Sequence, residues 1–133
     1  MDADPVERAL QAARAAMGRA YAPYSGFDVG AAIVAGDEIF TGQNIENASY
    51  PVSVCAERNA VGRMIDAGER RIDVVAVVTA ADAPTPPCGA CRQVLWEFGP
   101  DAVVVAETVA GARRTWTLAE LLPDAFGPAD LDR

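Results

Sequence analysis

Residues 86–93 read Pro86-Pro87-Cys88-Gly89-Ala90-Cys91-Arg92-Gln93, and this stretch joins a predicted strand to a predicted helix. The strand is Val74–Thr79, a short apolar run that is typical of a buried strand. The turn-rich segment 81–87 follows it, and a helix is predicted to begin at Cys88 and to end near Gly99-Pro100. A buried strand followed by a helix favours an α/β fold.

The sequence before this stretch adds two strands and a second helix that also begins at a cysteine. Val29–Val34 and Ile39–Gly42 flank a hairpin signal at residues 35–38. From Cys55 onward, apolar residues recur at helical spacing as far as Gly68. Segments 21–26 and 44–53 are predicted to be loops because they are polar or rich in Pro and Gly.

The two ends of the chain supply one more helix and the last strands. Asp4-Pro5-Val6-Glu7 predicts a helix start, with a capping carboxylate, Pro at the first helical position and Glu at the third. Strands are predicted at 102–106 and 113–116, and a short helix at 118–122. Together the elements predict an α/β fold with three layers, α/β/α, around a mixed sheet of about five strands. The length predicts a single domain over residues 1–133.

Composition narrows the chemistry and the partners. The chain has no histidine, which excludes Ser-His and Cys-His catalysis and imidazole metal ligands. The net charge of −8 disfavours a nucleic acid polymer as partner, and the doublets Arg70-Arg71 and Arg113-Arg114 are expected to be solvated surface charge. The apolar runs are too short to span a membrane, and the acidic start is unlike a signal peptide. The odd number of cysteines, three, favours a cytoplasmic protein without disulfides.

The three cysteines have the pattern of a catalytic zinc site. Cys88 and Cys91 are spaced to hold one ion together at the start of a helix, and Cys55 can join them if the two helix starts converge. Three protein ligands leave one coordination position open, whereas a structural zinc site uses four. Glu57, two residues after Cys55, is then expected to carry protons at the open position without being a ligand.

Three thiolates on one Zn²⁺ leave a net negative charge, which makes the ion a weaker acid toward a bound water. Two helix N-termini pointing at the sulfurs would oppose this charge. Arg58 and Arg92 could also donate hydrogen bonds to sulfur, and the hypothesis favours Arg58. Two other interpretations of the cysteines are a redox-active Cys-x-x-Cys pair and a purely structural zinc site. The first does not fit the position deep in the chain, and the second leaves Glu57 without a role.

The combination of Cys55-Ala56-Glu57 with the Pro86–Gln93 stretch resembles the zinc-dependent nucleoside and nucleobase deaminases, whose signature ends in Pro-Cys-x-x-Cys. Cys55 stands where members that act on nucleotides and polynucleotides typically have histidine, as in the small cytidine deaminases that act on free nucleosides. Segments 27–32, 44–51 and 121–127 are also similar to the homotetrameric members of that group. The resemblance extends from about Tyr21 to Gly127.

The resemblance implies a role for each residue of the candidate site. Cys55, Cys88 and Cys91 would bind one Zn²⁺ per subunit, and Glu57 would shuttle protons. Asn44 and Glu46 would bind the ribose hydroxyls, although polar capping of a loop is the alternative interpretation of both. The remaining substrate-binding residues would be Phe27 on the pyrimidine ring, Ala56 through its carbonyl, and Tyr50 and Phe126, which would complete the pocket of a neighbouring subunit in a homotetramer.

The implied reaction is hydrolytic deamination of cytidine and deoxycytidine to uridine and deoxyuridine, with release of ammonia, in pyrimidine salvage. A zinc-activated water would attack the base, and Glu57 would transfer the protons. Two alternatives remain open at this point. One is a deaminase of another cytosine-containing small molecule, of the blasticidin S type, and the other is a non-catalytic, zinc-stabilised module that binds nucleosides.

Overall fold

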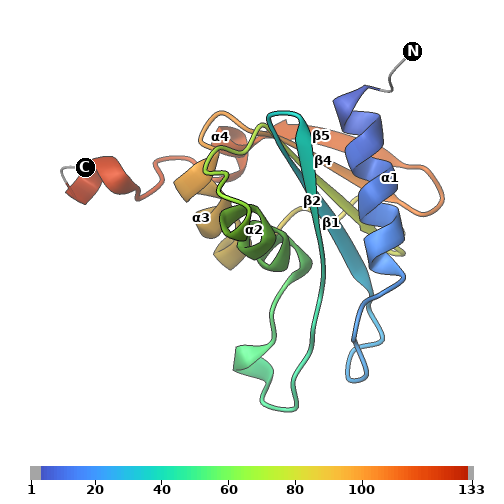
Figure 1. Ribbon diagram of the computed structural model, residues 1–133. Helices are drawn as coiled ribbons and strands as arrows, with labels where there is room; N and C mark the ends of the chain where they lie inside the picture. The colour runs from blue at the N-terminus through green and yellow to red at the C-terminus, as the bar shows by residue number, and fades with distance from the viewer. Residues whose placement is uncertain (1–3, 132–133) are drawn as a thin grey trace.

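The computed structural model describes residues 4–131, and its centre is a five-stranded sheet in the order β2-β1-β3-β4-β5 (Figure 1). β1 (Val29–Ala35) pairs antiparallel with both β2 (Glu38–Gln43) and β3 (Val74–Thr79). β4 (Val103–Thr108) runs parallel to β3, and β5 (Arg113–Thr117) returns antiparallel beside β4. The predicted mixed sheet of five strands is therefore confirmed.

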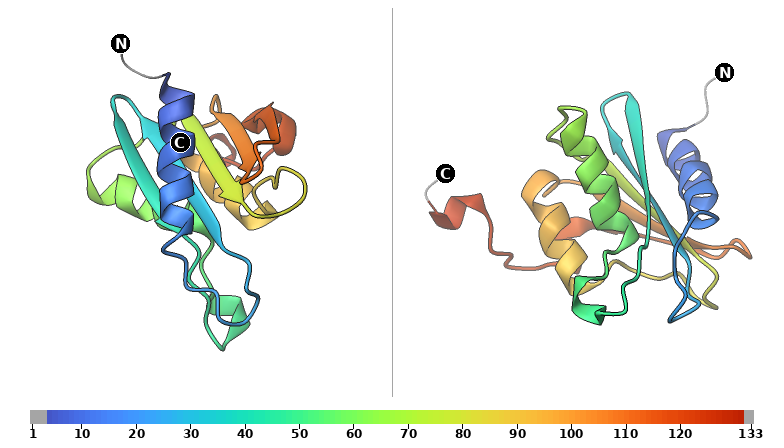
Figure 2. Two further views of the ribbon diagram at one scale, coloured as in Figure 1. Left: turned by 90° about the vertical axis from the view of Figure 1, so that its right-hand side faces the viewer. Right: turned by 60° about the horizontal axis from the view of Figure 1, so that its bottom comes forward.

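Helices cover both faces of the sheet (Figure 2). α1 (Pro5–Met17) lies on one face, while α2 (Ala56–Asp66) and α3 (Gly89–Phe98) lie on the other. The short α4 (Leu118–Leu121) directly follows β5. This arrangement confirms the three-layer α/β/α architecture. Within residues 4–131, no helix combines the length and the apolar character needed to cross a membrane.

The sheet has a hydrophobic core on each face because the side chains of a strand alternate in direction. In β1, Ala32 and Val34 pack with α1, whereas Ile33 and Ala35 belong to the core shared with α2 and α3. The strands β3 and β4 alternate in the same way, so their apolar runs are buried on both sides.

Two glycines allow helices to lie directly on the sheet. A Cβ atom at Gly30 of β1 would lie 1.8 Å from the carbonyl oxygen of Ala13 in α1. A Cβ atom at Gly42 of β2 would lie 2.3 Å from the carbonyl oxygen of Ala56, the first residue of α2. Because backbone atoms cannot move aside at such distances, the two positions require glycine. Gly42 thereby fixes the first turn of α2.

The first helix begins as predicted, and its Glu7 forms an ion pair with a distant strand. The Asp4 carboxylate accepts a hydrogen bond from the amide of Val6 at 2.8 Å, and Pro5 is the first helical residue. Glu7 pairs with Arg113 of β5 at 2.6 Å, and Arg113 also pairs with Glu107 at 2.7 Å. Arg113 is exposed, as expected of a surface charge, and it also joins α1 to the β4–β5 hairpin through these two ion pairs.

The remaining differences from prediction are at element ends. Cys55 and Cys88 are the N-cap residues of α2 and α3, so each helix begins one residue later than expected. β4 continues to Thr108, two residues beyond the predicted end. The predicted loops and tail contain two 3₁₀ turns, Tyr50–Val52 and Pro128–Leu131.

Candidate active site

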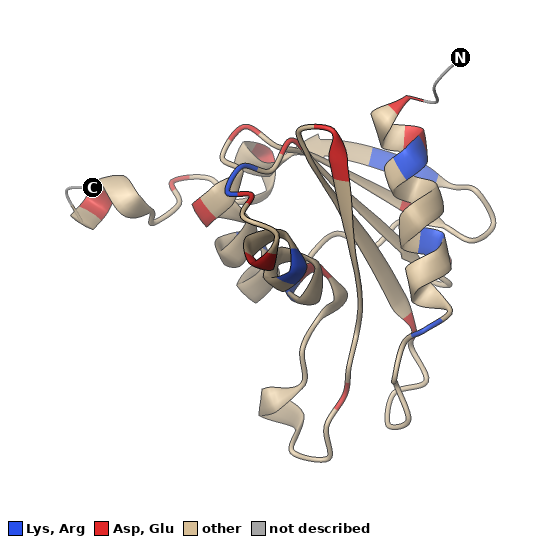
Figure 3. Cartoon of the chain, viewed as in Figure 1, with Lys and Arg blue, Asp and Glu red and all other residues tan. Residues whose placement is uncertain are grey.

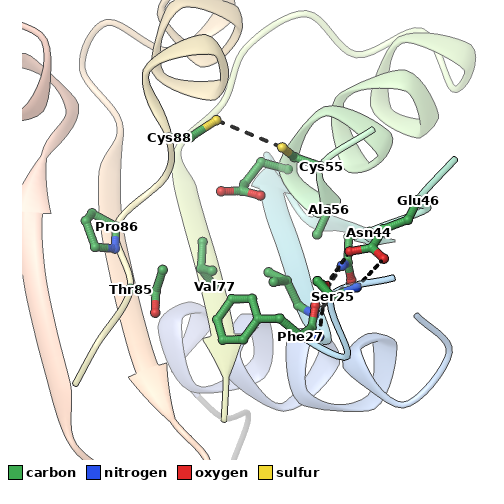
Figure 4. A pocket seen from close by; sticks show the side chains of 12 residues that line it. Ser25, Phe27, Asn44, Glu46, Cys55, Ala56, Val77, Thr85, Pro86 and Cys88 are labelled. Carbon is green, nitrogen blue, oxygen red and sulfur yellow. Dashed lines mark hydrogen bonds between the residues drawn. The ribbon is translucent and has the colours of Figure 1, made fainter. Parts of the chain in front are cut away.

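The three cysteine sulfurs converge where two helices begin. The chain runs from α2 back to the start of β3, and α3 begins after the end of β3, so the N-termini of both helices lie beyond the same strand end. Cys55 and Cys88 cap these helices, and Cys91 lies in the first turn of α3. The three Sγ atoms all lie within 4.8 Å of one another, and those of Cys55 and Cys88 are 3.9 Å apart (Figure 4).

This geometry fits a zinc ion. Zn–S bonds of about 2.3 Å in a tetrahedral site place two sulfurs about 3.8 Å apart, which is close to the observed Cys55–Cys88 separation. Thiolates are soft ligands that zinc favours, and the positive ends of two helix dipoles favour the ionised sulfurs. The expected convergence of the two helix starts is therefore confirmed, and the cluster can hold one zinc ion with three protein ligands.

The thiols influence one another through hydrogen bonds. Hydrogen bonding from Cys91, assisted by the Arg58 guanidinium, lowers the pKa of Cys55 to about 5. The pKa of Cys91 is raised because its thiol donates to Cys55 and is buried. A dication at the centre of the cluster favours the ionised form of all three sulfurs.

Glu57 is a buried carboxyl beside the cluster. Only 5% of the residue is exposed, and it forms part of the wall of the adjoining cavity. Burial raises the pKa of Glu57 to about 7, and the nearby Cys55 thiolate adds to the effect. A carboxyl group with a pKa near neutrality can both accept and donate a proton at physiological pH.

The two arginines considered for the zinc cluster have different partners. Nη2 of Arg58 lies 3.7 Å from Cys55 Sγ and donates to the Ser53 carbonyl at 3.2 Å. Arg92 donates to two carbonyl oxygens, those of Pro87 at 2.7 Å and of Leu121 at 2.8 Å. Of these two arginines, Arg58 is the one that hydrogen-bonds to sulfur, and it is the one that the hypothesis favoured. Arg92 instead links the loop before Cys88 to α4.

A cavity of about 290 Å³ opens onto the sulfurs, close to the lower limit of small-molecule sites. Seven of the residues predicted for the site line it: Phe27, Asn44, Glu46, Cys55, Ala56, Glu57 and Cys88. The polar side chains Asn44 and Glu46 come from the segment after β2, while the sulfurs come from the helix starts (Figure 4). The cavity thus places hydrogen-bonding groups at one side and the cysteine sulfurs at another.

Asn44 and Glu46 also hold the loop that carries Phe27. The Asn44 amide donates to the Phe27 carbonyl and accepts from the Val29 amide, both at 2.8 Å. The Glu46 carboxylate accepts from the amides of Tyr24 and Ser25, both at 3.0 Å. Loop capping, the alternative interpretation, is therefore present in the structure. Both side chains still have unused hydrogen-bonding capacity, since an amide group offers four positions and a carboxylate about four.

The backbone of Ala56 presents its amide, and not its carbonyl, as the free group. The carbonyl oxygen lies against Gly42 of β2, as the 2.3 Å approach of a Cβ atom at that position shows. The amide belongs to the first turn of α2, where helical N–H groups have no partner within the helix. A substrate contact through the Ala56 carbonyl is therefore disfavoured, and a contact through its amide replaces it as a proposal.

Tyr50 and Phe126 lie outside this cavity. Tyr50 lines a neighbouring cavity of about 350 Å³ together with Tyr24 and Ser53, and its ring lies 5.9 Å from that of Tyr24. Phe126 is 59% exposed, and its carbonyl accepts a hydrogen bond from Gln93 of α3 at 2.8 Å. Neither ring lines the cavity that opens onto the cysteine sulfurs of its own chain.

The cavity also contains residues that the sequence reasoning missed, among them Ser25 and Thr85. The Thr85 hydroxyl lies 3.1 Å from that of Thr79, at the end of β3. Ser25 stands directly before Gly26, whose φ of +68° makes a tight turn. A serine before a turn glycine was the available signal, but serine in loops is too common for it to indicate a site.

The comparisons with known proteins agree with this geometry. Residues 4–107 match the family model described as "Cytidine and deoxycytidylate deaminase zinc-binding region". A cytidine deaminase of Halalkalibacterium halodurans is 43% identical over 129 residues, which cover 96% of this chain and 95% of the relative. A cytidine deaminase of Mycobacterium tuberculosis is 43% identical over 123 residues, covering 92% of this chain and 89% of the relative.

Solved structures show the same fold. The crystal structure of cytidine deaminase from Burkholderia pseudomallei superposes with a TM-score of 0.87 at 47% sequence identity. The match covers 90% of this chain and 98% of that structure. The crystal structure of cytidine deaminase from Mycobacterium leprae superposes with a TM-score of 0.79 at 37% identity, covering 92% of this chain and 100% of that structure.

Proposed function

The chain belongs to the cytidine and deoxycytidylate deaminase zinc-binding family, and on this premise we propose that it hydrolyses cytidine and deoxycytidine to uridine and deoxyuridine, with release of ammonia. The observation that carries the proposal is the position of a buried glutamate, Glu57, beside a three-thiol cluster in one cavity. A non-catalytic binding module has no need of a buried, proton-accepting carboxyl at that place.

Cys55, Cys88 and Cys91 would hold a zinc ion, which would supply a Lewis acid that lowers the pKa of a water molecule. Glu57 accepts a proton from this water as the water oxygen attacks C4 of the cytosine ring, and it delivers the proton to ring N3. Glu57 then passes the second proton of the water to the amine nitrogen, which leaves C4 as ammonia. The C4 carbonyl of uridine forms, and Glu57 ends in its starting state.

The other lining residues account for recognition of a nucleoside. The remaining hydrogen-bonding capacity of Asn44 and Glu46 suits the ribose hydroxyls. Phe27 offers an aromatic face to the pyrimidine ring, and the Ala56 amide offers a donor to an acceptor atom of the base. Arg58 opposes the negative charge of the thiolates through its contact with Cys55.

The proposal extends to assembly and setting. We place Tyr50 and Phe126 in the pocket of a neighbouring subunit of a homotetramer, since both rings are exposed and neither lines its own cavity. The three free thiols suit the reducing cytoplasm, where the reaction would serve pyrimidine salvage.

The direct test is an assay of purified, zinc-loaded protein with cytidine, deoxycytidine and blasticidin S in separate reactions. We expect the ultraviolet absorbance of cytidine to fall as uridine forms, with one ammonia released for each uridine. Turnover of blasticidin S alone would assign the chain to the blasticidin S type. Binding of cytidine without any turnover would instead identify a non-catalytic module.

A further inference from the structure

One hydroxyl group, that of Ser25, connects two parts of the substrate cavity. Its Oγ donates to Oε2 of Glu46 and accepts a hydrogen bond from the Phe27 amide at 3.0 Å. The Ser25 amide also donates to Oε1 of Glu46 at 3.0 Å. The turn that makes this possible contains Gly26, whose φ of +68° brings the Phe27 amide back toward the serine side chain.

The direction of each hydrogen bond follows from counting donors. A serine hydroxyl has one hydrogen and two lone pairs. The Phe27 amide occupies a lone pair, and an ionised carboxylate can only accept, so the hydroxyl hydrogen must point at Glu46. Two amides fill Oε1 of Glu46, which leaves the free acceptor position of the carboxylate on Oε2, the oxygen that Ser25 holds.

The same contacts keep Glu46 ionised. Hydrogen bonds from the Ser25 hydroxyl and amide, and from the Tyr24 amide, hold the pKa of Glu46 below its ordinary value. An ionised carboxylate accepts hydrogen bonds only, and the groups of a nucleoside that donate at the sugar are its hydroxyls. Phe27 is also held through its carbonyl by Asn44, so it keeps a hydrogen-bond partner when the Ser25 hydroxyl is removed.

We propose that Ser25 is a positioning residue that orients the Glu46 carboxylate and thereby sets the preference of the enzyme for nucleosides with 2′- and 3′-hydroxyls. The proposal rests on the proposed function, since it assigns the carboxylate to the sugar. A positioning role and a purely structural role of the Ser25 turn predict different dependence on the substrate. A structural role predicts equal losses for every substrate, whereas a positioning role predicts a loss confined to substrates that have a 2′- or 3′-hydroxyl.

The test compares cytidine with 2′,3′-dideoxycytidine, which lacks the 2′- and 3′-hydroxyls, in native protein and in the Ser25→Ala variant. We expect Ser25→Ala to lower kcat/KM for cytidine about ten- to a hundredfold, mainly through KM, because a hydrogen bond to a charged group is lost. In the same variant, kcat/KM for 2′,3′-dideoxycytidine should change by less than about twofold. Ser25→Thr keeps the hydroxyl and should retain most of the cytidine preference.

Two controls make the result specific. Ser49→Ala removes a hydroxyl group from the segment after β2. Within residues 4–131 this hydroxyl makes no hydrogen bond, so the variant should leave kcat/KM for both substrates unchanged. In a double-mutant cycle, Ser25→Ala should add little to the loss caused by Glu46→Gln, because both changes affect one interaction. Thermal unfolding and zinc content of each variant show whether the fold and the metal site are intact.

Three results would each overturn the proposal. They are equal losses of kcat/KM on the two substrates, an unchanged kcat/KM for cytidine in Ser25→Ala, and a Ser25→Thr variant as impaired as Ser25→Ala. The affinities of native and Ser25→Ala protein for uridine and 2′,3′-dideoxyuridine, measured by calorimetry, give the same ratio without turnover. If native protein binds these nucleosides but does not deaminate cytidine, the proposed function fails. The effect of Ser25→Ala on the ratio of the two affinities still tests the role of Ser25.

Discussion

We propose that proton transfer in this site depends on Glu57 alone. The chain contains no histidine, and the other carboxylate that lines the cavity, Glu46, is held by the amides of Tyr24 and Ser25. Burial raises the pKa of Glu57 to about 7, while hydrogen bonds lower that of Glu46. The two carboxylates of one cavity are thus tuned in opposite directions, one for proton transfer and one for a constant negative charge.

Replacement of Glu57 by Gln separates metal binding from catalysis. Because Glu57 is not a zinc ligand in this account, the variant should retain the metal while kcat falls by about 10²–10⁴-fold or more. Metal analysis by mass spectrometry and a cytidine turnover assay on the same sample measure both quantities. Near-normal turnover in Glu57→Gln would show that another group transfers the protons.

Arg58 is expected to act on the pH dependence of the reaction. Its guanidinium lies 3.7 Å from Cys55 Sγ and opposes the negative charge of the thiolates. In Arg58→Ala that charge is less opposed, so the zinc-bound water becomes a weaker acid, and the acidic limb of the pH–rate profile should move to higher pH. Arg63→Ala, in the last turn of the same helix, is the matched control and should leave the limb in place. An unmoved limb in Arg58→Ala would remove this role.

Among the elements, the contact of α2 with β2 determines where Cys55 and Glu57 lie. The first turn of α2 rests on Gly42, and the same helix carries Gly62 at a position with open space around it. Gly42→Ala should destabilise the protein by about 1–3 kcal/mol or more, because the methyl group meets backbone atoms of Ala56 and Ala60. It should also weaken zinc binding, since the first turn of α2 must move.

Gly62→Ala is the control for this prediction. It replaces a helical glycine by alanine without a contact, so it should stabilise the protein by about 0.5–1 kcal/mol and leave zinc binding unchanged. Chemical denaturation and competition with a zinc chelator measure the two effects. Equal zinc affinity in the two variants would mean that Gly42 does not fix the position of the metal site.

Elements and clustered motifs could be predicted from the sequence because their signals are local. The valine-rich strand Val74–Thr79 and the helix starts at Cys55 and Cys88 are read from neighbouring residues. The Ser25 contact with Glu46 and the approach of the Ala56 carbonyl to Gly42 join residues that are distant in sequence, so spacing does not reveal them. The pairing of the exposed Arg113 with Glu7 was not predicted for the same reason, since Glu7 lies at the other end of the chain.

In the whole molecule, ion pairs and the cysteine cluster link elements that are not neighbours in the sheet. Charged residues of both signs lie along α1 (Figure 3). Arg113 connects α1 to the β4–β5 hairpin on one face, and the cysteine cluster lies between the starts of α2 and α3 on the other. A metal that binds only the folded chain stabilises it through the binding free energy. The protein should therefore be less stable without zinc.

Removal of zinc with a chelator should lower the thermal unfolding midpoint by more than about 5 °C, because the link between the two helices is lost. Addition of zinc should restore the midpoint, and addition of Mg²⁺ should not, since Mg²⁺ prefers oxygen ligands. Differential scanning calorimetry of the chelated and reconstituted samples makes the measurement. An unchanged midpoint after complete removal of zinc would contradict the structural role of the metal.

The proposed sharing of pockets between subunits can be tested by complementation. Phe126→Ala and Glu57→Gln should each be nearly inactive alone. Oligomers that mix the two should regain activity, because some pockets then combine an intact Glu57 with an intact Phe126 from the neighbour. Activity after mixing that equals the sum of the separate variants would show that each pocket is complete within one chain.

The central claim is that zinc on the three thiols, together with Glu57, deaminates cytidine in this cavity. The most direct measurement is a titration of zinc into metal-free protein while cytidine loss, uridine formation and ammonia release are followed together. If this claim holds, the rate rises with added zinc up to one ion per chain and then stays constant, with uridine and ammonia formed in equal amounts. Unchanged cytidine in the presence of fully zinc-loaded protein would contradict it.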